Sequence, residues 1–241
     1  MAEGLLLVDK PAGMTSHDAV DVCRRAYAER SIGHLGTLDP FATGLLVLLC
    51  GRATRLATFI DTDPKVYEAT VRFGSATDTG DVTGTAAPAT ALPVEAAVRR
   101  AAEMLTGAIE QLPPAYSAKQ VGGMRAYAAA RRGKPLALAP VLVQVHDWRF
   151  TAWRPADSAN GRDGRDGTVA EVDVTVTCGA GTYLRTLAED LGRHAGSSAH
   201  LSALRRVRAG VFDIADAHTL AALREQTPPP PLRALRVVAD A

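Results

Sequence analysis

The chain has 241 residues, of which 47% are hydrophobic, and a net charge of +1. This length suits one large domain or two small ones, and the apolar content excludes a disordered chain as the default. The net charge gives no overall field that favours nucleic acid. Only four of the 27 basic residues are lysines, a bias that suits bidentate contacts to phosphate or simply an arginine-rich genome.

Cysteine usage and hydropathy indicate the cellular setting. Cys23, Cys50 and Cys178 are far apart and odd in number, so they form neither a disulfide framework nor a metal site. They are best interpreted as buried thiols of a reducing compartment. Because no apolar run approaches the roughly 18 residues of a membrane span, we expect a soluble, cytoplasmic protein without membrane contacts.

The sequence of the first half predicts a strand, a helix and two further strands before a long loop. Residues 4–8 read as a buried strand, and TSHD at 15–18 is a capping-box start to a helix reaching Tyr27. LLVLLC at 45–50 is strand-like. VYEATVRF at 66–73 alternates cleanly, with Tyr67, Ala69, Val71 and Phe73 on one face.

The second half mixes helices and strands without strict alternation. Pro93 begins a helix that Gly107 ends, and 113–135 reads as loop and short helix. Two strands, 141–153 and 169–178, flank hairpin-turn dipeptides. A helix follows GAGT, then a short helix at 199–204 and a strand at 207–214. The fold class is therefore α+β with a mixed, mostly antiparallel sheet flanked by helices.

Several familiar catalytic sites are excluded by their missing motifs. The sequence has no phosphate-binding loop, no dinucleotide fingerprint, no G-x-S-x-G elbow and no histidine pair at metal spacing. We therefore expect no metal and no nucleotide cofactor.

Asp39 is the first candidate for chemistry, in GHLGTLDPFATG at 33–44. Pro40 excludes helical geometry at Asp39, and the nearby glycines let the backbone turn or approach a ligand closely. An aspartate held in this way suits a nucleophile or general base. The alternative is a turn aspartate that bonds nearby backbone, and Asp-Pro by itself favours that alternative.

Arg185 and Tyr67 are the next candidates. Arg185 lies in the first turn of the helix after Gly181, where the helix dipole disfavours a cation. Its position suggests an anionic partner, either a carboxylate or a phosphate, against the alternative of a solvated arginine. Tyr67 is either a core aromatic or a platform on which a base stacks.

The remaining candidates are His34 and a basic segment. His34 lies in the glycine-rich loop near Asp39 and would ordinarily be a turn histidine. The segment 113–135 interleaves Lys119 and Arg125 with tyrosines, a composition that suits nucleic acid or equally a solvated basic helix.

Taken together, these blocks resemble the TruB family of tRNA pseudouridine synthases. GHLGTLDPFATG matches the family pattern G-H-x-G-x-L-D-P-x-A-T-G at every fixed position. The K-P-x-G-x-T-S opening, the K-x-Y strand, the P-P-x-Y-S-A segment and the two last blocks follow in order between residue 5 and about residue 212. One departure is Gln120, which stands where the family usually has lysine.

The resemblance implies a pseudouridine synthase fold. It also implies that the protein isomerises uridine 55 in the T loop of tRNA to pseudouridine, without cofactor or metal. Asp39 resembles the nucleophile, acting at ribose C1′ or uracil C6, and Arg185 the arginine paired with it. Tyr67 resembles the residue that stacks on the base and moves the C5 proton. By the same resemblance, substrate-binding residues are His34, Tyr183, Leu204, Lys119 and Arg125.

The resemblance also gives expectations for organisation and partners. It implies a catalytic domain over 1–226, an RNA-clasping insertion near 113–135, and a short proline-interrupted tail at 227–241 in place of a full C-terminal RNA-binding domain. We expect a monomer that binds the T stem-loop of tRNA. Two alternatives stay open: a relative acting on another uridine or RNA, and a non-catalytic RNA-binding module.

Overall fold

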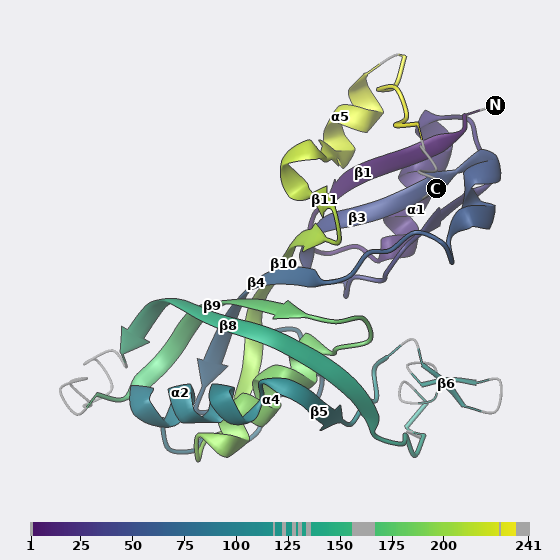
Figure 1. Ribbon diagram of the computed structural model, residues 1–241. Helices are drawn as coiled ribbons and strands as arrows, with labels where there is room; N and C mark the ends of the chain where they lie inside the picture. Colours follow the sequence, from purple (N-terminus) through teal and green to yellow (C-terminus); the bar gives the residue numbers. More distant parts are fainter. Residues whose placement is uncertain are drawn as a thin grey trace, which may run out of the picture. The chain divides into compact units, whose positions relative to one another are not determined.

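The computed structural model shows a chain divided into two compact units. Unit 1 comprises residues 1–67 and 205–241, and unit 2 comprises residues 68–204. The structure describes residues 2–117, 119–121, 124–126, 129, 132–133, 136–155, 167–226 and 228–234, and for residues 120, 121 and 125 it describes only the backbone. In Figure 1, unit 1 contains both the purple start and the yellow end of the chain.

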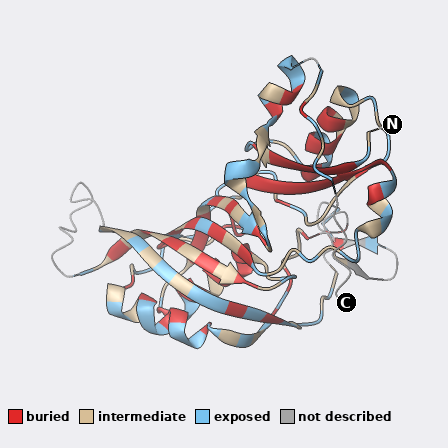
Figure 2. Cartoon of the chain, turned by 45° about the horizontal axis from the view of Figure 1, so that its top comes forward, coloured by how far each residue is buried: buried red, intermediate tan, exposed pale blue. Residues whose placement is uncertain are grey.

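Unit 1 is built on the central pair β1 and β3, which are antiparallel and buried along nearly their whole length (Figure 2). Each face of this pair carries an apolar cluster, one with Leu6 and Leu46 and the other with Leu5 and Leu45. The elements wholly in unit 1 are β1 (Gly4–Lys10), α1 (Ser16–Ala26), β2 (Ile32–His34), β3 (Thr43–Cys50), η1 (Gly51–Leu56), β11 (Phe212–Asp213), η3 (Ile214–Asp216), β12 (His218–Thr219) and α5 (Leu220–Glu225).

Unit 2 is a layer of strands with helices on one face. Figure 1 shows α2 and α4 against the strands, and the alternating burial of β9 reflects one face turned to these helices. The elements wholly in unit 2 are α2 (Glu95–Met104), β5 (Gly107–Gln111), β6 (Gln120–Val121), β7 (Met124–Arg125), β8 (Val141–Pro155), β9 (Val169–Cys178) and α4 (Leu184–His194).

Two strands, β4 (Lys65–Phe73) and β10 (Ala199–Ala209), contribute residues to both units. The hydrogen-bonded order of the large sheet is β12-β1-β3-β10-β4-β9-β8-β5, with β2 on β3 and β11 on β10. The pairs β1–β12 and β3–β10 are parallel, whereas β1–β3, β5–β8 and β8–β9 are antiparallel. The prediction of a mixed, mostly antiparallel sheet is confirmed.

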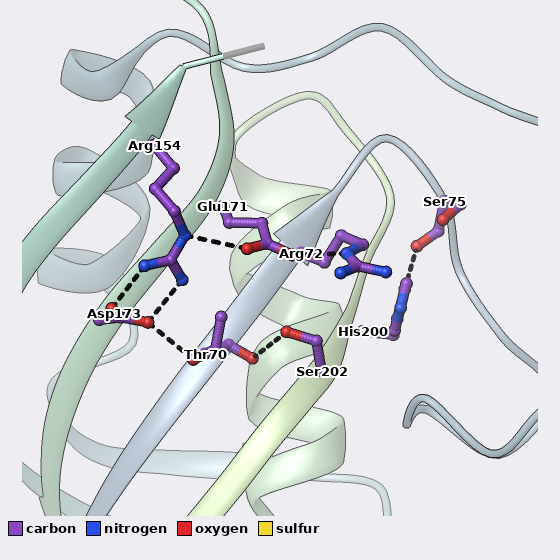
Figure 3. Close-up of polar contacts among 8 residues, drawn as sticks. All are labelled: Thr70, Arg72, Ser75, Arg154, Glu171, Asp173, His200 and Ser202. Atoms are coloured by element: carbon purple, nitrogen blue, oxygen red, sulfur yellow. Dashed lines mark hydrogen bonds and ion pairs between the residues drawn. The ribbon is translucent and has the colours of Figure 1, made fainter. Parts of the chain in front are cut away.

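Polar side chains tie three strands of unit 2 together on the face opposite the apolar side chains (Figure 3). Arg154 of β8 donates to both carboxylate oxygens of Asp173 on β9, at 2.6 and 2.7 Å. Asp173 also accepts the Thr70 hydroxyl of β4 at 2.7 Å, and Glu171 accepts from Arg72 at 2.6 Å. These hydrogen bonds, led by that of Arg154, hold the pKa of Asp173 below its usual range.

Two predicted elements differ from the structure. The strand predicted at 207–214 is instead the end of β10, a turn at 210–211 and the short β11. Residues 199–204 are not a helix but the first part of β10, which pairs with strands on both sides. Alanine and leucine give AHLSAL a helical preference, and the ladder to neighbouring strands overrides it. The part of the predicted helix at 113–135 beyond residue 126 lies almost entirely outside the described residues, and 120–121 and 124–125 form the small β6–β7 ladder.

Candidate active site

Asp39 lies on the segment between β2 and β3, and main-chain contacts within unit 1 determine the path of that segment. Gly36 has φ +130° and Gly44 has φ +103°, values that favour glycine, on either side of Asp39. The amide of Ala42 donates to the Asp39 carbonyl at 3.1 Å and closes a turn around Pro40. The Asp39 side chain is half-buried.

The start of α1 holds the middle of this segment. Leu38 is buried, and its amide donates to the Ser16 hydroxyl at 2.8 Å while that hydroxyl donates to the Leu38 carbonyl at 3.1 Å. On the other side of Asp39, the Gly13 amide donates to the Pro40 carbonyl at 2.8 Å. Both main-chain neighbours of Asp39 are therefore held by residues at the start of α1 or just before it.

Lys10 adds a buried cation at the end of β1. It is fully buried, and Nζ donates to the carbonyls of Pro11 at 2.8 Å, Met14 at 2.9 Å and, more weakly, Pro40 at 3.5 Å. Burial lowers its pKa from 10.5 to about 8, while the negative charge of Asp39 opposes this shift. Lys10 therefore interacts electrostatically with Asp39 and also bonds Pro40, the residue next to it.

Arg206 of β10 holds the two outer parts of the segment. Its side chain is among the largest fully buried ones in the described chain. Nε donates to the Leu45 carbonyl at 2.8 Å and Nη2 to the Gly36 carbonyl at 3.0 Å, while Nη1 reaches the Thr37 carbonyl at 3.5 Å.

His34 and Tyr67 are the other candidates in unit 1. His34 ends β2, and its buried Nδ1 has no hydrogen-bond partner within the described chain. Burial, followed by the positive charge of Arg206, lowers the pKa of His34, so its imidazole is neutral at neutral pH. Tyr67 is 7% exposed in β4, so it lies on the buried face that the alternation predicts.

Arg185 lies in unit 2, in the first turn of α4, and is 4% exposed. It is therefore not a solvated arginine. Nη1 donates to the Thr79 carbonyl at 2.9 Å and Nη2 to the Tyr116 carbonyl at 2.7 Å. Nε lies 4.0 Å from a carboxylate oxygen of Asp81, which is itself buried. A buried carboxylate thus faces the cation that the helix dipole disfavours.

The surroundings of Arg185 are themselves held by polar contacts. Asp81 accepts the Thr83 amide at 2.9 Å and the Thr79 hydroxyl at 3.0 Å, which fixes the loop before Arg185. Gln111 is fully buried, donates to the Tyr183 carbonyl at 3.0 Å and accepts the Tyr183 amide at 2.7 Å. Tyr183 and the start of α4 therefore have a defined backbone position.

The remaining predicted site residues lie in unit 2. Leu204 is buried in β10, Tyr183 is half-buried at the N-terminus of α4, and Lys119 is half-buried before β6. The backbone of Arg125 is in β7, and its side chain lies outside the described residues. Asp39, His34 and Tyr67 belong to unit 1 and Arg185 to unit 2, so the pairing of Asp39 with Arg185 stays a prediction.

Sequence reasoning missed Ser16, Arg206, Asp81 and Gln111. In the sequence, Ser16 is recognisable only as part of a capping box and Asp81 only as part of a polar loop. Each of the four is polar and at most 5% exposed, and each contacts residues that are distant in sequence. Strand alternation gives a hint for Arg206, because it places Arg206 on the same face as Leu204, and a charged residue on a buried face needs an internal partner.

Within the described ranges, no three histidine, cysteine or acidic side chains gather as metal ligands would. No described helix has the length and apolar character to cross a membrane.

Comparisons with known proteins extend along nearly the whole chain. Residues 24–184 match the family model of the TruB family pseudouridylate synthase N-terminal domain, and residues 185–228 match the tRNA pseudouridylate synthase B C-terminal domain. The tRNA pseudouridine synthase B of Thermobifida fusca is 47% identical over 91% of this chain and 74% of that protein. Its counterpart from an Arthrobacter species is 46% identical over 94% of this chain and 72% of that protein.

A solved structure shows the same fold. A chain in an H/ACA RNP bound to a substrate RNA containing 2′-deoxyuridine has a TM-score of 0.65 and 23% identity. The match covers 92% of this chain and 52% of the solved chain, so this chain spans about half of that relative. Because the first family model covers more than half of the chain, the protein belongs to the TruB family of pseudouridylate synthases.

Proposed function

We propose that this protein isomerises uridine 55 in the T loop of tRNA to pseudouridine. Family membership supports the reaction, and relatives at 46–47% identity are named tRNA pseudouridine synthase B. The C1′–N1 bond breaks, the uracil turns, and a C1′–C5 bond forms. C5 releases a proton to solvent and N1 takes one up, so the reaction consumes no oxidant or reductant.

Asp39 is the proposed nucleophile, and the observation that carries this role is how its segment is held. Ser16 bonds Leu38 on one side of Asp39, and Gly13 and Lys10 bond the Pro40 carbonyl on the other. The main chain is therefore restrained on both sides of this half-buried aspartate. Attack at ribose C1′ or uracil C6 therefore needs little reorganisation of the enzyme.

Arg185 is proposed to pair with Asp39 and keep it ionised in a closed site. The guanidinium is already buried and held by the Thr79 and Tyr116 carbonyls, so its direction is set without substrate. Tyr67 would stack on the target base and move the C5 proton. His34 is neutral and can occupy space left by a flipped nucleotide without a charge to desolvate.

The other assignments concern the RNA. Leu204 and Tyr183 would line the uracil pocket, which suits a buried leucine and a half-buried tyrosine. Lys119 and Arg125, within 113–135, would bind phosphates of the T stem-loop. Flipping a base out of a loop costs less than flipping one out of a helix, which favours a T-loop target.

Tritium release from 5-tritiated uridine in a T stem-loop RNA tests this function. Wild-type protein should release tritium, and an RNA with cytidine at the target position should not yield release from that site. Asp39→Asn should lower the single-turnover rate by more than about 10³-fold with RNA binding retained, because the amide cannot attack. Asp21→Asn, which changes a partly exposed carboxylate of α1, is the matched control.

The outcomes separate the roles. A wild type that binds RNA without releasing tritium would show a binding module and not an enzyme. Loss of RNA binding together with turnover in Asp39→Asn would indicate a structural aspartate. Arg185→Ala should slow turnover by about 10²-fold, and a near-normal rate would refute its pairing with Asp39.

A further inference from the structure

The proposed mechanism leaves one large buried group without a role, and that group is Arg206. It is 2% exposed, and its hydrogen bonds within the described chain all go to main-chain carbonyls. A buried guanidinium without a direct carboxylate partner is costly to desolvate. Apolar packing therefore does not explain why Arg206 is buried.

The three carbonyls that Arg206 contacts lie on both sides of Asp39. Gly36 and Thr37 precede Asp39, and Leu45 follows it at the start of β3. The guanidinium is planar and rigid, so hydrogen bonds from two or three of its nitrogens set the positions of these carbonyls relative to one another. Arg206 thereby sets the distance between the two ends of the segment that carries Asp39.

The backbone of Arg206 contacts the same segment from another side. β10 runs parallel to β3 with Arg206 opposite Gly44. Gly44 has φ +103°, and a Cβ there would collide with the Arg206 main chain. Only glycine fits, so Arg206 and the end of the Asp39 segment are in contact through both main chain and side chain.

The positive charge of Arg206 is also felt by neighbouring groups of unit 1. Burial is the main cause that lowers the pKa of His34 and of Lys10, and the charge of Arg206 lowers both further. Arg206 therefore lies close to His34, which precedes the Asp39 segment, and to Lys10, which bonds Pro40 within it.

From these contacts we infer that Arg206 is a positioning residue for catalysis, which holds the Asp39 segment in its reactive geometry by joining the carbonyls of Gly36 and Leu45. The inference rests on the proposed role of Asp39 as nucleophile. Arg206 acts through the segment and does not itself touch the substrate. Ser16 and Lys10 hold the middle of the segment, whereas Arg206 holds both ends.

Arg206→Lys is the test variant, because it keeps the charge and the stem but loses the planar fork. Arg208→Lys is the matched control, since Arg208 lies two residues further along the same strand, is exposed, and bonds only the Gly210 carbonyl among described atoms. Three quantities are measured: the single-turnover rate at saturating T stem-loop RNA, the RNA dissociation constant, and amide hydrogen exchange followed by mass spectrometry.

We expect Arg206→Lys to slow single turnover by on the order of tenfold, and by at least about threefold, because small misplacements of a nucleophile are costly. The RNA dissociation constant should stay within about threefold, since phosphate contacts dominate affinity. Hydrogen exchange should quicken in peptides covering 36–45 and stay unchanged in β8. Arg208→Lys should match wild type in all three.

Other outcomes would overturn the inference. A rate loss below about threefold would show that the segment does not need Arg206. Faster exchange throughout unit 1, or a rate loss matched by weaker RNA binding, would show a general structural role. If the wild type makes no pseudouridine, the proposed function fails, and the exchange at 36–45 still decides whether Arg206 positions the segment. Should Arg206→Lys not fold, Arg206→Gln is measured in the same way.

Discussion

Two residues of this protein are unusual because they are buried cations whose hydrogen bonds go to main-chain carbonyls. Lys10 and Arg206 are both fully or nearly fully buried, and the donors of both point at main-chain carbonyl oxygens. Arg206 contacts both ends of the Asp39 segment, whereas Lys10 bonds Pro11 and Met14 and reaches the segment only weakly, at Pro40. Carbonyl dipoles only partly replace the water that each cation loses. Such a cost is tolerated where a geometry has to be held, as at the segment that carries Asp39.

Lys10 gives a prediction for the pH dependence of stability. Burial lowers its pKa in the folded protein to about 8, from 10.5 in the unfolded chain. Below pH 8 it is protonated in both states, and between these values the unfolded chain binds more protons, so its contribution to stability rises with pH. Wild type should therefore gain stability relative to Lys10→Met between pH 8 and 10.5, by roughly 3 kcal/mol at most.

Urea unfolding of both proteins at pH 7 to 10.5 measures this gain. Tyr27, Cys23 and Cys50 also titrate at high pH, but both chains contain them, so their contributions cancel in the difference. A difference in the free energy of unfolding that stays constant across the range would contradict the low pKa of Lys10.

At the scale of elements, the start of α1 does two tasks with adjacent residues. Thr15 accepts the Asp18 amide at 3.1 Å, while Asp18 accepts the Thr15 amide at 2.8 Å, so the capping box predicted from TSHD is present. Ser16, the next residue, bonds Leu38 in the Asp39 segment. The cap therefore fixes where α1 begins, and so it positions Ser16 to bond Leu38 in the Asp39 segment.

Thr15→Ala should lower the free energy of unfolding by about 1 kcal/mol, because the Asp18 amide loses its partner. Thr15→Ser keeps a hydroxyl that can cap the helix and should stay close to wild type. Chemical denaturation of the three proteins at pH 7 gives the comparison. Equal losses in the alanine and serine variants would mean that the methyl group, and not the cap, stabilises this helix start.

The sequence predicts those elements whose pattern is local. The strand at 4–8, the capped helix from TSHD and the alternating strand at 66–73 all depend on neighbouring residues, and all are present. β10 was misassigned in part, since its state depends on strands that are distant in the chain. Arg206 was missed for the same reason: Gly36 lies 170 residues before it. The TruB motifs point to Asp39 and to Lys10 as structural support for the site, but not to Ser16 or Arg206, which hold the Asp39 segment.

At the scale of the whole molecule, the two ends of the chain form one unit. Unit 2 is inserted between Tyr67 and Arg205, and the chain then returns to complete unit 1 with β11, β12 and α5. β12 pairs with β1 at Val8 and Asp9, which covers the edge at one end of that strand. The segment after the prolines covers the same edge at Leu5.

The contacts of this last segment predict what its removal costs. Leu5 and Arg233 exchange two main-chain hydrogen bonds of 2.9 Å, the Tyr27 hydroxyl donates to the Pro230 carbonyl at 2.7 Å, and Leu232 packs on the core cluster. At about 1 kcal/mol for each hydrogen bond and a similar amount for the leucine, deleting 227–241 should cost about 2–4 kcal/mol.

A chain that ends at Ala234 keeps all of these contacts and is the matched control. The deletion of 227–241 also leaves the β1 edge unpaired at Leu5, and an uncovered edge can pair with another chain. We therefore expect a lower urea midpoint and concentration-dependent self-association in light scattering for that deletion alone. If both shortened chains unfold at the same urea concentration and stay monodisperse, the segment does not close unit 1, and the stability of β1 comes from β3 and the two apolar clusters by themselves.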